Sequence, residues 1–486
     1  MGDMWVIDME SISLEFLQEG FSNIVGVEDV ISDPHTLEKY SKDQSFVPPR
    51  KPLLVVRPET MTEVQEIVKM ANRYKVPLTP YSSGKNNQGT TIPFATGVII
   101  DLSKMDRVSE IDMENRNVAI EPGVTFAQLQ KEAKKHDLRV LTPIELPSSA
   151  SVIATYIELC PLYSWPKYGT ENMLTMELVL GNGDILRTGS SATPIIDKPY
   201  DPVAGPYGFL NKIWFGSQGT LGIVTRGIVK LKTLHDTNKV FFVSSDKIDN
   251  ILRVVKDIKR ARIGEEIFLA NNMELALLLA ENPSDVIELR KALEPWTLVV
   301  IIRGFNEEVE FQEKDLGDIV AKYNMKLRDE IKGIESANKI ILNEIEFPHG
   351  WEKTSQFKGA RNVIPFITTT ETIQEFNNLA YRLADKYDYP SENIGCFMLP
   401  VELGSVHYQY SFARDPNDPS ETQKVKELFY ELCDLLIKQG AFFSRPYGDC
   451  ARLVYSRTPN YYSFIKELKK IVDPEYIMNP NKIFVI

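Results

Sequence analysis

The chain has 486 residues and a formal net charge of −12, and 43% of its residues are hydrophobic. This length exceeds what one hydrophobic core usually accommodates, so we expect two domains. The acidic balance argues against nucleic-acid binding, because such proteins need positive surface to displace counterions. An acidic surface could instead suit a basic protein partner, and an ordinary solvated surface is the alternative.

The sequence contains no run of about 18 apolar residues, so we expect no membrane span. Its N-terminal stretch, MGDMWVIDME, lacks a positive region followed by an apolar one and is therefore not a secretory signal. We predict a cytoplasmic protein on this basis. The four cysteines are widely spaced and form no CxxC pair, which predicts buried reduced thiols and no metal site.

Residues 1–50 are predicted to form an N-terminal helical extension, which ends in the proline-rich run at 47–52. Strand and helix patterns alternate over residues 51–236. A strand at 55–57 leads to a helix at 62–71, where apolar residues recur at helical spacing and where Thr60 or Thr62 could cap the first turn. Further strands are expected at 97–102 and from 119, the second leading into another helix.

The stretch LTPYSSGKNNQG, residues 78–89, lies between a predicted helix and the predicted strand at 97–102. Ser82, Ser83 and Gly84 combine small side chains with a residue that is free to take a positive φ, so backbone N–H groups are left unobstructed. Such a turn suits a phosphate. An ordinary surface turn is the alternative, because clusters of Gly, Ser and Asn are common in loops.

Gly181-Asn182-Gly183 separates two apolar runs at 176–180 and 184–188. An Asn-Gly pair in this setting predicts a β-hairpin in which both central residues take a positive φ.

A second α+β domain is predicted over residues 237–450. Its strands are expected at 239–243, 296–303 and 406–414, and its helices at 248–263, 373–387 and 422–439. Residues 451–486, with a helical pattern at 464–471, are predicted to return to the first domain.

This order of motifs resembles the FAD-binding domain of the vanillyl-alcohol oxidase and p-cresol methylhydroxylase family, and the resemblance covers most of the chain. The turn at 83–87, the strand at 410–415 and the tail segments at 472–474 and 479–482 are similar to the branch that oxidises 4-alkylphenols. The resemblance implies an α+β, two-domain PCMH-type FAD-binding fold with a ferredoxin-like α+β cap domain. No GxGxxG, P-loop, HExxH or GxSxG motif competes with this interpretation.

The resemblance also implies which residues hold FAD. The turn would bind the pyrophosphate, and the segments near residues 147–151 and 219–224 would line the rest of the cofactor. The residues expected to contact FAD are Pro80, Tyr81, Ser82, Ser83, Gly84, Lys85, Asn86, Asn87, Pro147, Ser148, Ser151, Gly219, Gly222, Ile223, Val224, His407, Arg445 and Lys482.

The substrate side departs from the family pattern. Gln88 stands where the family has a tyrosine, the tyrosine–arginine pair near the C-terminus becomes Ser444-Arg445, and Trp165 replaces another tyrosine. The family aspartate beside the flavin would fall near Ser148 or Ser149 and is therefore lost. These losses favour hydride removal from a benzylic, allylic or similar carbon of an aromatic-type substrate that need not be a phenol. Arg445, Trp165 and Tyr408 are the expected catalytic residues.

Several expectations concern the cofactor link and the partners. The histidine that tethers the flavin in relatives aligns with Val406, so the next residue, His407, should point away from the flavin. Non-covalent FAD is therefore favoured, with His407 and Tyr408 kept as candidates for a covalent link. We expect a dehydrogenase that passes electrons to a protein subunit, and an oligomer. The alternatives are an FAD-dependent D-2-hydroxyacid dehydrogenase, an oxygen-using alcohol oxidase, and a non-enzymatic flavin-binding subunit.

Overall fold

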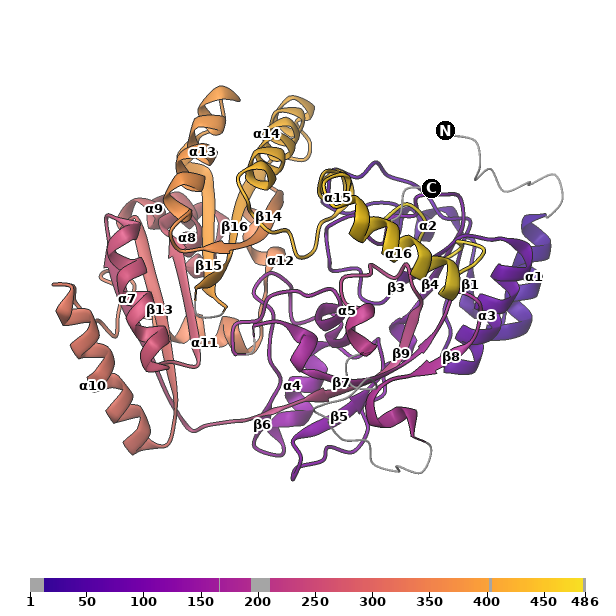
Figure 1. Cartoon of the computed structure of the whole chain (residues 1–486), viewed down its shortest axis with the longest axis horizontal. Coiled ribbons are helices and arrows are strands. Elements are labelled where there is room, and N and C mark those ends of the chain that lie inside the picture. Colours follow the sequence, from indigo (N-terminus) through magenta and orange to yellow (C-terminus); the bar gives the residue numbers. More distant parts are fainter. Residues whose placement is uncertain (1–12, 166, 194–209, 402–403, 484–486) are drawn as a thin grey trace.

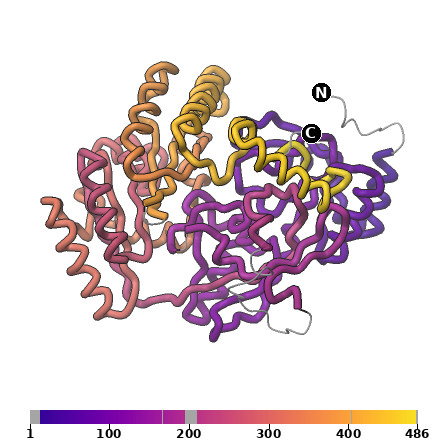
Figure 2. Tube along the Cα trace, viewed as in Figure 1, coloured from indigo at the N-terminus to yellow at the C-terminus, as the bar shows by residue number. Residues whose placement is uncertain are grey.

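The computed structural model describes residues 13–165, 167–193, 210–401 and 404–483, and it forms two domains that lie side by side (Figure 1). The trace in Figure 2 shows that the C-terminal helices return to the domain that contains the N-terminal part of the chain. Both domains combine helices with sheets, as the sequence predicted. No helix among the described residues is long and apolar enough to cross a bilayer.

The first domain begins with a four-stranded sheet in the order β1-β2-β4-β3, in which β2 and β3 both pair in parallel with β4. The predicted helix after β2 is present, and Thr60 begins it with a capping box to Glu63. The strands are β1 (Val30–Ile31), β2 (Leu54–Val56), β3 (Leu78–Tyr81) and β4 (Val98–Asp101), and the helices are α1 (Leu14–Val25), α2 (Pro34–Lys39) and α3 (Met61–Tyr74).

A second sheet of this domain has the order β5-β9-β7-β8, and a short β6-β10 pair lies beside it. The predicted hairpin joins β7 to β8, but only Gly183 of its central Asn-Gly pair has a positive φ, +86°. Gly183 N donates to Leu180 O, which closes a β-turn over residues 180–183. In this turn only the last residue, Gly183, has a positive φ. These elements are β5 (Asn117–Ile120), α4 (Phe126–Lys134), β6 (Leu138–Arg139), α5 (Val152–Ile157), β7 (Met173–Val179), β8 (Ile185–Arg187), β9 (Ile223–Lys230) and β10 (Lys232–Thr233).

The second domain contains an antiparallel six-stranded sheet in the order β11-β13-β12-β15-β16-β14. Its two halves share a β-α-β-β-α order, except that α8 and α9 are inserted between the second and third strands of the first half. Strands β12 and β15 meet at the centre, and β11 and β14 lie at the edges. The sequence interpretation missed this repeat. The strands are β11 (Thr237–Ser245), β12 (Glu266–Asn271), β13 (Trp296–Gly304), β14 (Ala360–Thr369), β15 (Ile394–Pro400) and β16 (Ser405–Arg414).

Helices cover both faces of this sheet. Apolar side chains of α7, α10, α13 and α14 pack on one face, and those of α8, α9 and α11 pack on the other. The second face also approaches the first domain (Figure 1). The helices are α7 (Ile248–Ala261), α8 (Asn272–Leu279), α9 (Val286–Ala292), α10 (Asn306–Lys322), α11 (Ala337–Glu346), α12 (Trp351–Thr354), α13 (Ile373–Lys386) and α14 (Pro419–Lys438).

The chain then returns to the first domain through α15 (Gly448–Ser456) and α16 (Pro459–Val472). Lys469 of α16 is buried, and its ammonium donates to Asp473 and to the carbonyl oxygens of Thr220 and Met478. The Asp473 carboxylate also accepts from the backbone N–H groups of Ile477 and Met478. This buried ion pair therefore ties α16 and the segment after it to the loop that precedes β9.

We predict that Lys469→Met lowers the free energy of unfolding of the apoprotein by about 3–5 kcal/mol, because it leaves the Asp473 carboxylate buried without its cation. Urea titration followed by far-UV circular dichroism measures this change. Lys470→Met is the matched control, since it removes the same charge from the next residue, where the ammonium is exposed and pairs with Glu467. Equal destabilisation by the two substitutions would contradict the prediction.

Candidate functional site

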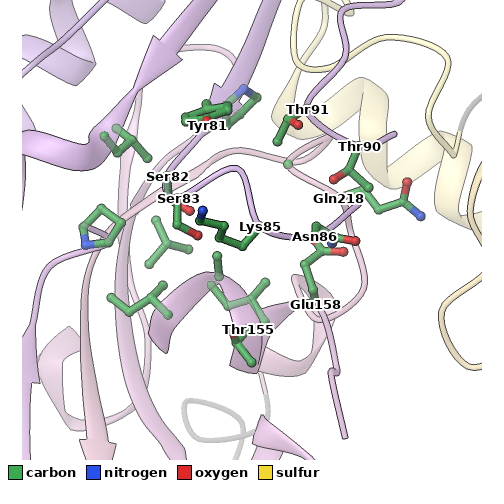
Figure 3. A pocket seen from close by; sticks show the side chains of 18 of the residues that line it. Tyr81, Ser82, Ser83, Lys85, Asn86, Thr90, Thr91, Thr155, Glu158 and Gln218 are labelled. Atoms are coloured by element: carbon green, nitrogen blue, oxygen red, sulfur yellow. The ribbon is translucent and has the colours of Figure 1, made fainter. Parts of the chain in front are cut away.

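The predicted phosphate turn forms one wall of a pocket in the first domain (Figure 3). In that view Ser82, Ser83 and Lys85 lie along the turn. Thr155 and Glu158 lie at the opposite wall, which is formed by α5 and the residue after it. The segment that leads into β9 closes a third side. The described lining residues outside the turn include Leu102, Pro122, Leu146, Ala150, Ile153, Ala154, Ile157, Cys160, Trp214, Ser217, Gln218, Gly219, Gly222, Ile223, Val224 and Asn479.

Local contacts fix the shape of the turn. Gly84 has φ +64°, and a Cβ atom added there would lie 2.0 Å from the Tyr81 hydroxyl oxygen. Ser83 Oγ accepts a hydrogen bond from Ser151 N at 3.0 Å. Ser151 also caps α5, since its Oγ accepts from Ala154 N. The turn is thus joined directly to the first residues of the helix on the opposite wall.

The pocket residues fit FAD. Gly219 lies across from the turn with φ +67°, and a Cβ atom there would come within 3.0 Å of Pro80 Cγ, so main chain lines both sides of a narrow space. Small side chains predominate around it. A pyrophosphate could approach the backbone of residues 82–85 here, and the apolar lining from Leu146, Ile153 and Trp214 suits the rings of the cofactor.

The structure brings most of the predicted cofactor residues together at this pocket. Those that line it are Pro80, Tyr81, Ser82, Ser83, Gly84, Lys85, Asn86, Gly219, Gly222, Ile223 and Val224.

The other predicted cofactor residues near the turn lie outside the described pocket lining. Asn87 faces a separate small cavity beside Tyr447. Ser148 N donates to Pro348 O at 2.5 Å, and the neighbouring Pro147 is buried. Lys482 donates to the carbonyl oxygens of Gly89 and Ile92, so it supports the loop after the turn. Ser151 likewise supports the turn, through the contacts described above.

A buried polar cluster adjoins the pocket where the two domains meet. Arg445 lies 2.8 Å from Glu145 through Nη2 and Oε2, and its Nη1 donates to Cys160 Sγ at 3.1 Å. Cys160 itself lines the pocket. Within the described structure, Arg445 Nε and Glu145 Oε1 are buried and have no hydrogen-bond partner. The ion pair therefore keeps one unused donor and one unused acceptor.

His407 of β16 faces this cluster. Its Nδ1 lies 3.2 Å from the Tyr168 hydroxyl and its Nε2 lies 3.1 Å from Gln409 Oε1. Burial lowers the pKa of His407 to about 4; the Glu145 carboxylate acts in the opposite direction and Arg445 acts in the same direction. His407 is therefore neutral at pH 7.

The orientation predicted for β16 was wrong. Its side chains alternate between two faces, and Tyr408 enters the core that includes α13, where its hydroxyl donates to Asn377 Oδ1 at 2.8 Å. His407 consequently points toward the first domain rather than away from it. The buried position of Tyr408 on the opposite face removes the basis for a catalytic role or a flavin link at that residue.

No described contact joins Trp165 to this cluster, and its catalytic role stays a prediction. Its side chain is 43% exposed, whereas Ser164 and Tyr168 on either side of it are the residues that contact buried groups of the second domain. The adjacent Pro166 lies outside the described residues. Tyr168, and not Trp165, therefore supplies the aromatic hydroxyl at the cluster.

The sequence interpretation missed two carboxylates, Glu145 and Glu158. Glu158 lines the pocket and accepts from the Tyr447 hydroxyl at 3.2 Å. Burial raises the pKa of Glu158 to about 7, and the hydrogen bond from Tyr447 and the charge of Arg445 oppose that rise. Both glutamates stand alone within apolar runs of the sequence, which is the signal that could have identified them, because a buried carboxylate needs a partner.

Groups of three or more histidine, cysteine or acidic side chains placed to hold a metal ion do not occur among the described residues.

Comparison with known proteins agrees with this site. Residues 52–189 match the FAD binding domain family, and residues 234–483 match the C-terminal domain of FAD linked oxidases. The chain is 25% identical over 511 residues to the flavoprotein subunit of 4-cresol dehydrogenase (hydroxylating) from Pseudomonas putida, covering 95% of this chain and 94% of that protein. It is also 25% identical over 465 residues to a glycolate oxidase subunit of Bacillus subtilis, covering 92% of each.

Solved structures share the fold over nearly the whole chain. A substrate-bound p-cresol methylhydroxylase matches with a TM-score of 0.84 at 20% identity, covering 97% of both chains. A 4-ethylphenol oxidase from Gulosibacter chungangensis matches with a TM-score of 0.83 at 18% identity, covering 97% of this chain and 98% of that one. The predicted two-domain PCMH-type fold and the predicted cofactor are confirmed. The chain belongs to the FAD-linked oxidases and is an FAD-dependent oxidoreductase.

Proposed function

We propose that the protein is a dehydrogenase that removes hydride from a benzylic, allylic or similarly activated carbon of an aromatic-type substrate. The observation that carries the proposal is the convergence of Glu145, Cys160, Tyr168, His407 and Arg445 beside the FAD pocket. Bound FAD supplies the two-electron acceptor. Shared fold with two enzymes named for phenolic substrates also supports this class.

The ion pair favours a neutral substrate. Arg445 is already matched by Glu145 at 2.8 Å, so the pair carries no net charge with which to attract an anion. A D-2-hydroxy acid would place a carboxylate beside a glutamate, which is unfavourable in a buried setting. A hydroxyl group, in contrast, could donate to Glu145 Oε1 and accept from Arg445 Nε, the two atoms that lack partners.

The rival function is oxidation of a D-2-hydroxy acid, since relatives include a glycolate oxidase subunit and a D-lactate dehydrogenase. Anaerobic bleaching of the flavin with a panel of benzylic alcohols, allylic alcohols, 4-alkylphenols and D-2-hydroxy acids separates the two. Bleaching by D-2-hydroxy acids alone would overturn the proposal.

We predict that FAD is bound non-covalently. Both ring nitrogens of His407 already face polar partners, and Tyr408 lies on the opposite face of β16. Precipitation of the yellow protein with trichloroacetic acid should leave the flavin in the supernatant. A yellow pellet, with flavin attached to the peptide that contains His407, would show a covalent link instead.

Arg445→Ala should lower the rate of flavin reduction by about 10²-fold or more, because it removes a fixed cationic donor that would stabilise negative charge on the substrate oxygen. Rapid-mixing absorbance under anaerobic conditions measures this rate. Arg445 also has a structural role through Glu145, so FAD content and melting temperature are measured in parallel. Arg445→Lys keeps the charge and should restore part of the rate.

Arg452→Ala is the matched control for this substitution, because Arg452 lies in α15 with an exposed side chain that pairs with Asp449. It should reduce flavin at the parental rate. An Arg445→Ala protein that folds, holds FAD and is reduced as fast as the parent would assign Arg445 a structural role alone.

We further propose that a protein accepts the electrons. The chain carries a net charge of −12, and one relative is named as the flavoprotein subunit of a dehydrogenase. Reduced enzyme should therefore be reoxidised slowly by air and faster by a basic cytochrome c, with the second rate falling as salt screens the attraction. Stopped-flow absorbance measures both rates. Rapid and complete reoxidation by air would favour an oxidase.

A further inference from the structure

Two cysteines that no sequence motif connects meet in the fold. Cys433 lies on α14 and Cys450 lies on α15, 17 positions later, and both side chains belong to the core on the α14 face of the second domain. Their sulfur atoms are 2.6 Å apart, and both side chains are buried, with exposed fractions of 0% and 5%. The other two cysteines are buried elsewhere, Cys160 beside Arg445 and Cys396 in β15.

This separation is close to that of a covalent pair. A disulfide has an S–S distance of about 2.0 Å, so bond formation requires a further approach of only about half an ångström. Unbonded carbon atoms make their best contact at about 3.5–4.0 Å, and sulfur atoms are larger than carbon atoms. Two unbonded sulfur atoms would therefore have to move apart from the observed distance. The packing of α14 on α15 thus places the two thiols in a geometry suited to oxidation.

The two helices that carry the pair line an open surface groove, although neither cysteine lines it. The groove residues flank both cysteines in sequence and are Tyr430, Glu431, Asp434, Asp449, Arg452 and Leu453. Three of these six side chains are carboxylates and one is a guanidinium. A negative groove disfavours anionic oxidants such as glutathione disulfide and admits a small neutral peroxide.

We propose that Cys433 and Cys450 are a modification site at which hydrogen peroxide forms a disulfide between α14 and α15. The Cys450 sulfur attacks one peroxide oxygen and the O–O bond breaks. The departing hydroxide takes the thiol proton and leaves as water, so that Cys450 becomes a sulfenic acid. The Cys433 sulfur then displaces the sulfenic oxygen as a second water while the S–S bond forms. The two thiols lose two electrons, and the peroxide gains them.

The bond would close a loop that carries part of the active-site region. Arg445 and Tyr447 lie between the two cysteines and contact Glu145, Cys160 and Glu158. A crosslink between α14 and α15 therefore limits how far the segment between the two cysteines can move. The inference does not depend on the substrate proposed above.

The test uses the FAD-loaded protein with dilute hydrogen peroxide, followed by denaturation and alkylation without reductant. Untreated protein should show four alkylatable thiols, and treated protein should show two, Cys160 and Cys396, with a crosslinked peptide that joins Cys433 to Cys450. The melting temperature should rise by several degrees and return to its initial value after treatment with a dithiol.

In Cys450→Ala, which starts with three thiols, peroxide should remove one alkylatable thiol or none and should not raise the melting temperature. Cys396→Ala should still form the bond. The thiol count of the parental protein decides the matter even if either variant folds poorly. Four thiols after peroxide, oxidation to sulfinic acid without a crosslink, or a bond between any other pair would each overturn the proposal.

Discussion

A buried charge destabilises a fold unless an opposite charge accompanies it, and in this protein that requirement joins the two domains. Glu266 of the second domain is fully buried, and burial alone would raise its pKa, yet Arg139 of the first domain and Arg303 hold that pKa at about 2. Beside the pocket, Arg445 and Glu145 are paired in the same way. Moving the domains apart would separate Arg139 from Glu266 and leave Glu266 with Arg303 alone, so these contacts help to hold His407 and Tyr168 beside the pocket.

The pocket depends on that arrangement because its two halves come from distant parts of the chain. The phosphate turn and α5 belong to the N-terminal part, whereas Arg445 and Tyr447 follow the whole second domain in sequence. Glu158 and Cys160 lie at the join, since both line the pocket and both contact residues from the later segment. A few side chains at this junction therefore join the wall of the pocket to the segment that follows the second domain.

Local patterns predicted what local physics decides. Apolar residues at helical spacing predicted α3, which Thr60, one of the two expected caps, begins. Small residues with a permissive Gly84 predicted the turn. The errors involved long-range packing. A strand has two faces, and only the contacts of β16 with α13 determine that Tyr408 enters the core while His407 leaves it. Glu145 and the Cys433–Cys450 pair were invisible for the same reason, because their partners are distant in sequence.

The return of the chain to the first domain bears on how the protein is made. Asn479 lines the FAD pocket, where its amide donates to the carbonyl oxygens of Thr90 and Gln218. The Lys469 ammonium donates to the carbonyl oxygen of Thr220. Because a ribosome releases these residues only after the entire second domain, that domain can fold as a continuous unit while the first still lacks part of its wall. The pocket of the first domain is therefore complete only after the C-terminal helices and the segment that follows them have been translated.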